Sequence, residues 1–365
     1  MQRIILILIA MVIANIPPLF AQHNDTEPPK REGWDHDISL YGNVKSATYA
    51  RYELDVIDEE IVRSVTNELR DYHFNEAGDV TKMVSYYGDG SIYSNKIYTY
   101  NANGDLTEEV YHNGDGTLRW RDTKQYDSDR NMVEIVMYNS DNLMYGKLIY
   151  EYDTDGNIIK EIRYGSDESV GWRGIYKYDA NGNVTEIVNY NLDGSSSWRS
   201  TYEYDDNGNM IEFAQYISDG TLLEKVRYKY NSAGAISEKA VYKSDGTLSH
   251  TEIYKYNTRG DEVETAQYNS EGLLRWMRTK KYDAEGRLCE YIGYLSDKSI
   301  EERITYEYDA TSRIVEGMCY DATGALNNKT TYEYDVKGNM ILETTYQGES
   351  LIPIYQTELI ITYRD

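Results

Sequence analysis

Glutamate recurs at one fixed interval along most of the chain, and pairs of carboxylates are the catalytic groups of glycoside hydrolases. Eight glutamates are separated by 26 residues or by a multiple of 26: Glu108, Glu134, Glu186, Glu212, Glu238, Glu264, Glu290 and Glu316. In an antiparallel sheet of hairpins such residues lie about 9.6 Å apart, close to the carboxyl separation of inverting enzymes. A catalytic pair is usually unique, whereas eight equivalent copies are typical of a structural role. We therefore predict a non-catalytic protein and name no catalytic residue.

The histidines and the acidic turns suggest no other catalytic or metal site. No two histidines share a repeat position beside a suitable nucleophile, so neither a catalytic triad nor a zinc site is indicated: His23, His36, His73, His112 and His250. The stretch DTDGN, from Asp153 to Asn157, resembles the start of a calcium loop. An EF-hand needs glutamate at loop position 12, where this chain has Tyr164. A tight turn accounts for the same residues, so we predict no metal and no cofactor.

Tryptophan is the residue whose occurrence differs most between equivalent positions. Four of the five tryptophans share one repeat position, at which other copies carry Ser, Gly, Glu, His or Asn: Trp120, Trp172, Trp198 and Trp276. A position that accepts Glu and Asn is not typical of a sealed core, so we expect exposed rings. Trp172 and Trp198 belong to adjacent copies, which predicts an aromatic platform for a glycan or a protein partner. The alternative is that the rings fill a wider part of the interior.

These positions recur because the chain is a tandem array with a period of 26 residues. The copies open with the pattern YxYD or a close variant of it and contain two turn signals, such as Asp179 with Gly182 and Asp193 with Gly194. Asp can hydrogen-bond the backbone two residues on, Gly takes a positive φ, and the Asp-Gly pair predicts a type I′ turn. Residues alternate in polarity between the turns, which predicts two antiparallel strands per copy and roughly 22 strands in all. The copies start at residues 72, 98, 124, 150, 176, 202, 228, 254, 280, 306 and 332.

The spacing of charges favours an antiparallel meander over a parallel solenoid. A solenoid would stack the eight glutamates about 4.8 Å apart, whereas a meander leaves a slot between them. Seven basic residues at one repeat position could fill that slot: Arg121, Lys147, Arg173, Arg199, Lys225, Arg303 and Lys329. We expect an all-β fold in which tandem 26-residue β-hairpin repeats form one long coiling antiparallel sheet, because open sheets of more than about ten strands curl. A propeller is a minor alternative, since eleven copies do not pair evenly.

The ends and the composition complete the organisation that we predict. Residues 1–21 have the charge, apolar run and small residue of a cleaved signal peptide; a retained anchor is the alternative. We expect a linker at 22–37, N-terminal capping strands at 38–71, eleven repeats at 72–357 and a C-terminal cap at 358–365. The net charge of −25 disfavours binding to nucleic acid or anionic lipid. Because a signal peptide directs export, the expected location is the periplasm, the cell surface or the extracellular space, with no membrane insertion after signal cleavage.

The two cysteines are predicted to be free thiols. Cys289 and Cys319 fall in consecutive copies, two strands and four residues apart in a meander. A disulfide needs Cα atoms within about 7 Å, which this register does not allow.

The repeated motifs resemble the YD repeats of Rhs-type bacterial proteins. The signature Tyr-Asp followed by Gly-Asn occurs in YEYDTDGN (150–157), YKYDANGN (176–183), YEYDDNGN (202–209) and YEYDVKGN (332–339). The resemblance covers residues 72 to about 350; the Arg that often follows the turn in that family occurs only at Arg287 and Arg313. It implies an antiparallel sheet that spirals into a shell, as in the related teneurins and insecticidal toxin complexes. It also implies carbohydrate or cell-surface binding.

Two functions are compatible with these patterns. The first is a secreted, non-catalytic binding or structural module at the cell surface, with a glycan or a surface protein as partner. The second is a shell-like scaffold that encloses or escorts another polypeptide.

Overall fold

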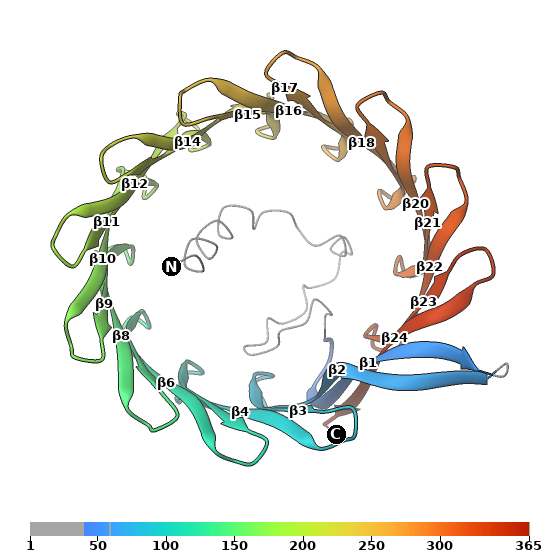
Figure 1. Ribbon diagram of the computed structural model, residues 1–365, viewed down its shortest axis with the longest axis horizontal. Coiled ribbons are helices and arrows are strands. Elements are labelled where there is room, and N and C mark those ends of the chain that lie inside the picture. The colour runs from blue at the N-terminus through green and yellow to red at the C-terminus, as the bar shows by residue number, and fades with distance from the viewer. Residues whose placement is uncertain (1–39, 58–59, 365) are drawn as a thin grey trace.

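The computed structural model describes residues 40–57 and 60–364, which form a single antiparallel sheet of 24 strands (Figure 1). The all-β fold of tandem hairpins is thus confirmed. The predicted signal peptide and linker lie outside the described residues. The strands are β1 (Val44–Ile57), β2 (Glu60–Phe74), β3 (Val80–Tyr86), β4 (Ile92–Tyr100), β5 (Leu106–Asn113), β6 (Leu118–Tyr126), β7 (Met132–Tyr138), β8 (Met144–Tyr152), β9 (Ile158–Gly165), β10 (Val170–Tyr178), β11 (Val184–Asn191), β12 (Ser196–Tyr204), β13 (Met210–Ile217), β14 (Leu222–Tyr230), β15 (Ile236–Tyr242), β16 (Leu248–Tyr256), β17 (Glu262–Asn269), β18 (Leu274–Tyr282), β19 (Leu288–Leu295), β20 (Ile300–Tyr308), β21 (Ile314–Asp321), β22 (Leu326–Tyr334), β23 (Met340–Gln347) and β24 (Ile352–Tyr363).

The sheet closes on itself, so the long coiling sheet that we expected is only partly right. β1 pairs with β2 on one edge and with β24 on the other, and Ala47 and Tyr49 lie opposite Ile361 and Leu359. An open sheet would leave a row of unpaired N–H and C=O groups at each edge. Pairing of β1 with β24 removes both edges. The segments that we expected to cap the array therefore supply the two strands that join its ends (Figure 1).

The largest buried cluster lies at this seam. The amide of Asn339, which is fully buried, donates to the carbonyl oxygen of Tyr41 and to Asp335, each at 3.1 Å. Arg364 donates to the carbonyl oxygens of Val44 and Phe74. The two ends of the chain are thus fixed to each other as well as paired. The cluster contains Leu40, Val44, Ala47, Tyr49, Tyr72, Phe74, Val80, Met83, Tyr98, Leu106 and Leu359.

Both turns of a copy have the same three-residue form. The amide of Asp179 donates to Asn183 O at 2.9 Å, and Gly182, with φ 83°, donates to Asp179 O at 3.2 Å. In the second turn Gly194 is likewise left-handed, with φ 80°, and Asp193 is not among the residues with positive φ. This is a type I turn followed by one left-handed residue. The type I′ prediction for the Asp-Gly pair is therefore wrong, because the loop has three residues rather than two.

The tyrosine at the third position of each copy ties that copy to the one before it. The hydroxyl of Tyr178 donates to Ile158 O at 2.6 Å, at the start of the strand that follows the preceding copy's turn. All ten tyrosines at this position make the equivalent bond, at 2.6 to 3.0 Å: Tyr100, Tyr126, Tyr152, Tyr178, Tyr204, Tyr230, Tyr256, Tyr282, Tyr308 and Tyr334. Phenylalanine has no hydroxyl and could not satisfy this carbonyl. The bond accounts for ten of the 39 tyrosines of the chain.

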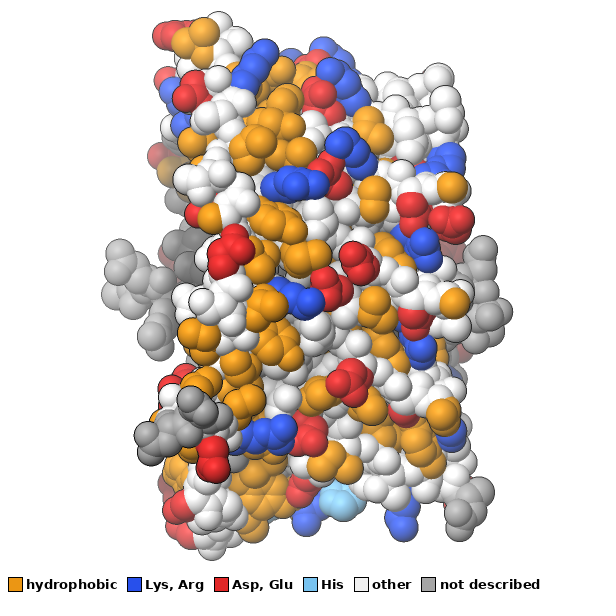
Figure 2. Space-filling view, turned by 90° about the vertical axis from the view of Figure 1, so that its right-hand side faces the viewer, with side chains coloured by type: hydrophobic (Ala, Val, Ile, Leu, Met, Phe, Trp, Pro, Cys, Tyr) orange, Lys and Arg blue, Asp and Glu red, His pale blue; other side chains and the backbone are white. Residues whose placement is uncertain are grey.

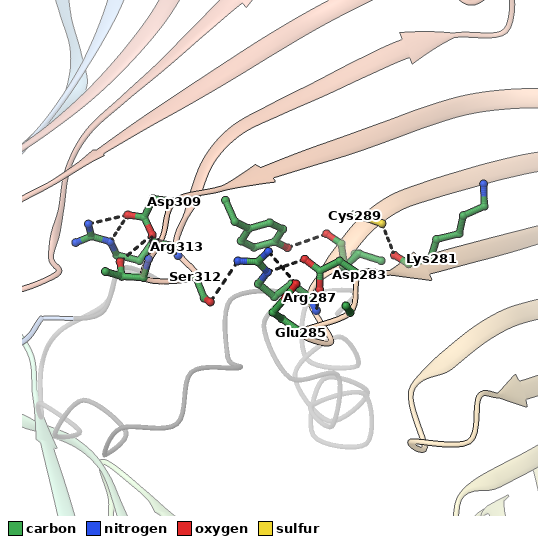
Figure 3. A network of polar contacts seen from close by, with 12 residues as sticks. Lys281, Asp283, Glu285, Arg287, Cys289, Asp309, Ser312 and Arg313 are labelled. Atoms are coloured by element: carbon green, nitrogen blue, oxygen red, sulfur yellow. Dashed lines mark hydrogen bonds and ion pairs between the residues drawn. The ribbon is translucent and has the colours of Figure 1, made fainter.

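Alternate residues of each strand lie on the two faces of the closed sheet. The outer face carries side chains such as Lys281, which points away from the interior in Figure 3. Figure 2 shows acidic, basic and hydrophobic side chains mixed over this outer surface. The inner face carries the opposite set, which includes Tyr176 and Trp172. Each face can therefore be examined separately for a candidate site.

Candidate functional site on the inner face

The outer face repeats the same three side chains from copy to copy. Glu186 forms ion pairs with Lys177 and Arg199, and the Arg199 guanidinium lies 5.6 Å from the centre of the Tyr216 ring. Hydrogen bonds from Lys177 and Arg199 hold the pKa of Glu186 below its usual value, although burial opposes this. The slot that we predicted between glutamates is filled in this way in five copies: Glu108–Arg121, Glu186–Arg199, Glu212–Lys225, Glu290–Arg303 and Glu316–Lys329. Such pairs link adjacent strands within one copy and engage these carboxylates in structural contacts.

The inner face combines tyrosines that recur from copy to copy, such as Tyr176, with positions that differ between copies. The variable position is the one that pairs with the first residue of each copy. Ile187 lies opposite Tyr176, and Phe213 lies opposite Tyr202. In other copies the residue at this position can be acidic, basic or aromatic, or can be a glycine. These residues are Glu109, Ile135, Glu161, Lys239, Thr265, Tyr291, Gly317 and Glu343. No structural contact between copies demands such variety. The inner face is therefore the candidate functional surface.

A closed sheet of this size encloses more space than its own side chains fill. The 24 strands, spaced about 4.8 Å apart, give a circumference of about 115 Å and a diameter of about 37 Å, which strand tilt increases. Barrels of about 16 to 18 strands already leave an open channel. A ligand as large as a polypeptide segment can thus reach the inner face.

The tryptophans of the predicted platform all lie on the inner face and are half-buried. Trp172 is opposite Asn191 and Trp198 is opposite Asn189, so β11 separates the two rings. No ring contact between them occurs in the described part of the wall. A basic side chain lies near each of the other two rings. Lys96 is 5.6 Å from the centre of the Trp120 ring, and Arg278 is 4.6 Å from the centre of the Trp276 ring. The four are Trp120 on β6, Trp172 on β10, Trp198 on β12 and Trp276 on β18.

One group of inner side chains, on β4 to β6, combines aromatic rings with carboxylates. Tyr111 and Trp120 are in contact, with ring centres 5.5 Å apart, and the Lys96 amine lies 5.5 Å from the centre of the Tyr111 ring. Asp122 has one buried oxygen without a partner. Burial, and then the charge of Glu109, raise the pKa of Asp122. This part of the wall can accept a hydrogen-bond donor from a ligand beside an aromatic surface.

A second group, on β15 to β17, is centred on Glu252, a carboxylate that no sequence motif singles out. Glu252 accepts hydrogen bonds from Tyr254 at 2.7 Å and Gln267 at 3.1 Å, and Lys239 lies 3.4 Å away. His250 Nε2 is 3.9 Å from Glu252, beyond hydrogen-bond range, and burial lowers the pKa of His250. A Ser-His-acid triad needs a hydrogen-bonded acid, so this arrangement does not meet that requirement. These side chains come from three strands, which only the register brings together.

A polar hollow of about 250 Å³ lies on the inner face at the seam. Arg51 pairs with Glu68 at 3.6 Å and lies 5.4 Å from the centre of the Tyr355 ring. Burial raises the pKa of Tyr49. The hollow is lined by Tyr49, Arg51, Glu343, Thr345, Tyr355 and Thr357. It is thus a third inner region, distinct in composition from the other two.

The two arginines of the family signature are structural (Figure 3). Arg287 bonds Asp283 at 2.6 Å and Ser312, in the turn of the next copy, at 3.3 Å. Its guanidinium also lies 4.8 Å from the centre of the Tyr308 ring. Arg313 bonds Asp309 at 2.8 Å in the same way; although burial opposes it, hydrogen bonds from Arg313 and Thr311 hold the pKa of Asp309 well below its usual value. These arginines close their own turns and support the adjoining copy.

The cysteines lie two strands apart, as the register predicted, and both are free. Cys289 is on β19 and Cys319 is on β21. The Cys289 thiol donates to Lys281 O at 3.4 Å, and burial raises the pKa of Cys319. The environment of Cys319 is therefore not that of an activated thiolate.

Within residues 40–57 and 60–364, no cluster of three or more His, Cys, Asp or Glu side chains could hold a metal ion. The same residues include no helix long and apolar enough to cross a membrane.

Comparisons with known proteins find one family model, described only as an uncharacterised protein, that matches residues 203–308. No curated protein matches the chain. Among solved structures it is similar to the TcdB2-TccC3-TEV crystal structure, with 11% identity and a TM-score of 0.36 over 80% of this chain and 20% of that one. It is similar to the Photorhabdus luminescens Tc holotoxin pore, with 10% identity and a TM-score of 0.32 over 80% and 20%. A porin-like protein from Bacteroides uniformis matches with 9% identity and a TM-score of 0.25 over 87% and 98%. The chain thus spans about a fifth of the length of the first two.

Proposed function

We propose that this protein is a non-catalytic shell that holds another polypeptide against its inner face. The observation that carries the proposal is the difference between the two faces of the same strands. Glu186, Arg199 and Tyr216 on the outer face have counterparts in most copies, whereas the residues opposite the first position of each copy range from Gly317 to Phe213 and Lys239. Repetition outside and variety inside suit a regular wall that contacts an irregular partner.

A polypeptide fits this inner face better than a glycan of identical units. A repeating sugar chain is best matched by equal sites at equal intervals. Trp172 and Trp198 are in adjacent copies, but Trp120 and Trp276 are not. The group around Asp122 and the group around Glu252 also differ in charge and aromatic content. An inner face whose chemistry changes around the ring suits a ligand whose side chains change along its length.

The proposal includes export of the protein from the cytoplasm and an evolutionary relationship to a repeat family. The composition of residues 1–21 supports export, and the turn motif supports a relationship to the Rhs-type YD-repeat proteins. In this chain Asp179 accepts hydrogen bonds from the amides of Asn181 and Asn183, each at 2.9 Å, so the motif has a clear structural purpose.

One observation favours glycan or surface-protein binding as a second candidate. Trp172 and Trp198 lie on the same face of adjacent copies, are half-buried, and do not contact each other in the described wall. Rings that retain exposed surface can stack on sugars.

Co-purification followed by proteolysis distinguishes the two functions. The tagged chain is isolated from the cell that produces it and treated with trypsin before and after the shell is unfolded in urea. An enclosed polypeptide should survive the first treatment and be digested after the second. A glycan array probed with the same preparation provides the comparison. Sugar binding without a protected polypeptide would favour the second candidate and contradict the first.

A further inference from the structure

The hairpin formed by β1 and β2 extends beyond the wall to which it belongs. These strands have 14 and 15 residues, against 7 to 9 in strands such as β3 and β4. Pairing of β1 with β24 reaches Glu53 opposite Tyr355, and pairing of β2 with β3 reaches Leu69 opposite Tyr86. Further along, β1 and β2 pair only with each other among the residues that the structure describes, and Figure 1 shows this hairpin pointing outward from the ring. We call residues 54–57 and 60–64 the ribbon.

A bulge sets the direction of the ribbon. The register of β1 against β2 shifts between Ala50 and Tyr52, whose partners are Leu69 and Val65. Three residues of β2, 66–68, therefore face a single residue of β1. Extra residues in one strand bend and twist the pair. The ribbon consequently leaves the wall instead of continuing along it.

The ribbon is apolar and has open edges. Four of its side chains are about half exposed: Val56 at 49%, Ile57 at 55%, Ile61 at 58% and Val62 at 43%. A two-stranded ribbon with no third strand presents unpaired backbone groups along each edge. Apolar side chains beside an open strand edge are what strand addition by a partner uses, because the edge supplies hydrogen bonds and the side chains supply contact area.

The charges of the ribbon indicate what kind of strand would fit. Asp55 and Glu60 are exposed, and neither of them forms an ion pair with the described residues. Arg63 is already engaged, since it lies 3.9 Å from Glu358 and 5.5 Å from the centre of the Tyr52 ring. The free charges are thus all negative. Two acidic ribbons would repel each other, and so would a ribbon and an anionic lipid surface.

We infer that the ribbon is a docking edge for an extended polypeptide segment in which basic and apolar residues alternate. The segment adds as a third strand along β2 between Glu60 and Ser64. Its apolar side chains lie on the face of Val56 and Ile61, and its basic side chains lie on the opposite face, with Asp55 and Glu60. This site lies on the outside of the ring and is independent of the function proposed for the inner face.

The test uses defined peptides and the full chain. A fluorescein-labelled octapeptide of alternating Lys and Val is titrated with the protein and followed by fluorescence anisotropy, with a Glu-Val octapeptide as the charge control. A Lys-Val peptide that is N-methylated at alternate residues controls for backbone hydrogen bonding. We expect saturable binding of the first peptide only, weakened at least tenfold by Ile61→Ser. Leu143→Ser, which changes a side chain that is 63% exposed elsewhere on the ring, should leave binding unchanged.

Charge reversal makes the test specific. The double variant Asp55→Lys/Glu60→Lys should lose the Lys-Val peptide and bind the Glu-Val peptide, with an unchanged circular dichroism spectrum. Equal binding of both peptides by the unaltered protein, or undiminished binding of the N-methylated peptide, would overturn the inference. So would a dimer that light scattering detects and that Ile61→Ser abolishes, because the occupant would then be a second copy. Sedimentation with phosphatidylglycerol vesicles that depends on Ile61 would overturn it in favour of a membrane.

Discussion

The outer and inner faces of the same strands follow different rules. On the outer face Glu186 lies between Lys177 and Arg199, and Arg199 in turn covers Tyr216. On the inner face the neighbours of Trp198 are Asn189 and Ile217, and no equivalent set recurs in the next copies. On the outer face the Glu186–Arg199 pair lies within one copy and the Arg199–Tyr216 contact joins that copy to the next, so most copies carry the same residues. On the inner face the hydrogen bond from Tyr178 also joins copies, whereas no recurring contact in the described wall fixes the residue at the position of Trp198, which leaves that position available for a ligand.

The largest expected effect concerns binding at the inner face. Trp172→Ala combined with Trp198→Ala should reduce recovery of the enclosed polypeptide at least a hundredfold, because two large contact surfaces are removed. Recovery is measured by co-purification and quantitative mass spectrometry. The matched outer variant, Tyr190→Ala with Tyr216→Ala, should retain the polypeptide. Loss of fold in the Trp variant, seen by circular dichroism, would instead show that these rings fill the interior.

The tyrosines should separate into two energetic classes. Tyr178→Phe removes the hydroxyl that donates to Ile158 O and should cost about 1–2 kcal/mol, because a partly buried carbonyl loses its partner. Tyr190→Phe, on the outer face, keeps the ring beneath Arg173 and should cost less than about 0.5 kcal/mol. Urea denaturation measures both. Equal costs would mean that the bond to the preceding copy is not what selects tyrosine.

The pH dependence of stability should have opposite signs on the two faces. The pKa of Glu186 is lowered in the folded state, so its contribution is present above its unfolded pKa and is lost as the pH falls through the folded value. The pKa of Asp122 is raised, so its carboxylate destabilises the fold above that raised pKa, and the penalty disappears as the pH falls.

Two variants test those signs. Glu186→Gln should lower stability at pH 7, by less than about 1 kcal/mol, and this effect should decline as the pH falls through the lowered pKa of Glu186. Asp122→Asn should raise stability at pH 7 and have no effect near pH 3. Both are measured by urea denaturation across that range. A loss of stability at pH 7 in Asp122→Asn would contradict the assignment of Asp122 as a group left without a partner.

The smallest expected effect is at a turn. Lys298 has a φ of 67°, a conformation that glycine adopts at the equivalent place in most copies. Lys298→Gly should raise stability by about 0.5–1 kcal/mol, because the strain of a left-handed residue is relieved. Thermal denaturation measures it, and recovery of the polypeptide should not change. A loss of stability would show that the lysine side chain makes a contact worth more than the strain.

The regular part of the molecule could be predicted from sequence, and the irregular part could not. The period located every turn, and the alternation of polarity placed the basic residues beside the glutamates because both lie within one repeating unit. Closure was missed because β1 and β24 lie outside the repeat, and their pairing depends on curvature summed over the whole sheet. The turn type was missed because Asp193-Gly194 gives no indication of whether the loop has two residues or three.

The candidate site was only partly predictable. The shared position of Trp172 and Trp198 showed that they lie on one face, but alternation alone does not say whether that face is inside or outside. The groups around Asp122 and Glu252 join residues from three adjacent strands, and only the register brings them together. The bond from Tyr178 to Ile158, 20 residues away, was missed for the same reason.

Site-specific photo-crosslinking at two consecutive residues tests the central claim most directly. A benzophenone amino acid replaces either Trp198, on the inner face, or Arg199, on the outer face, and the producing cells are irradiated. The backbone position is nearly the same, so only the face differs. The account predicts one discrete polypeptide adduct from position 198 and none of that mass from position 199. The same adduct from both positions, or from 199 alone, would contradict it.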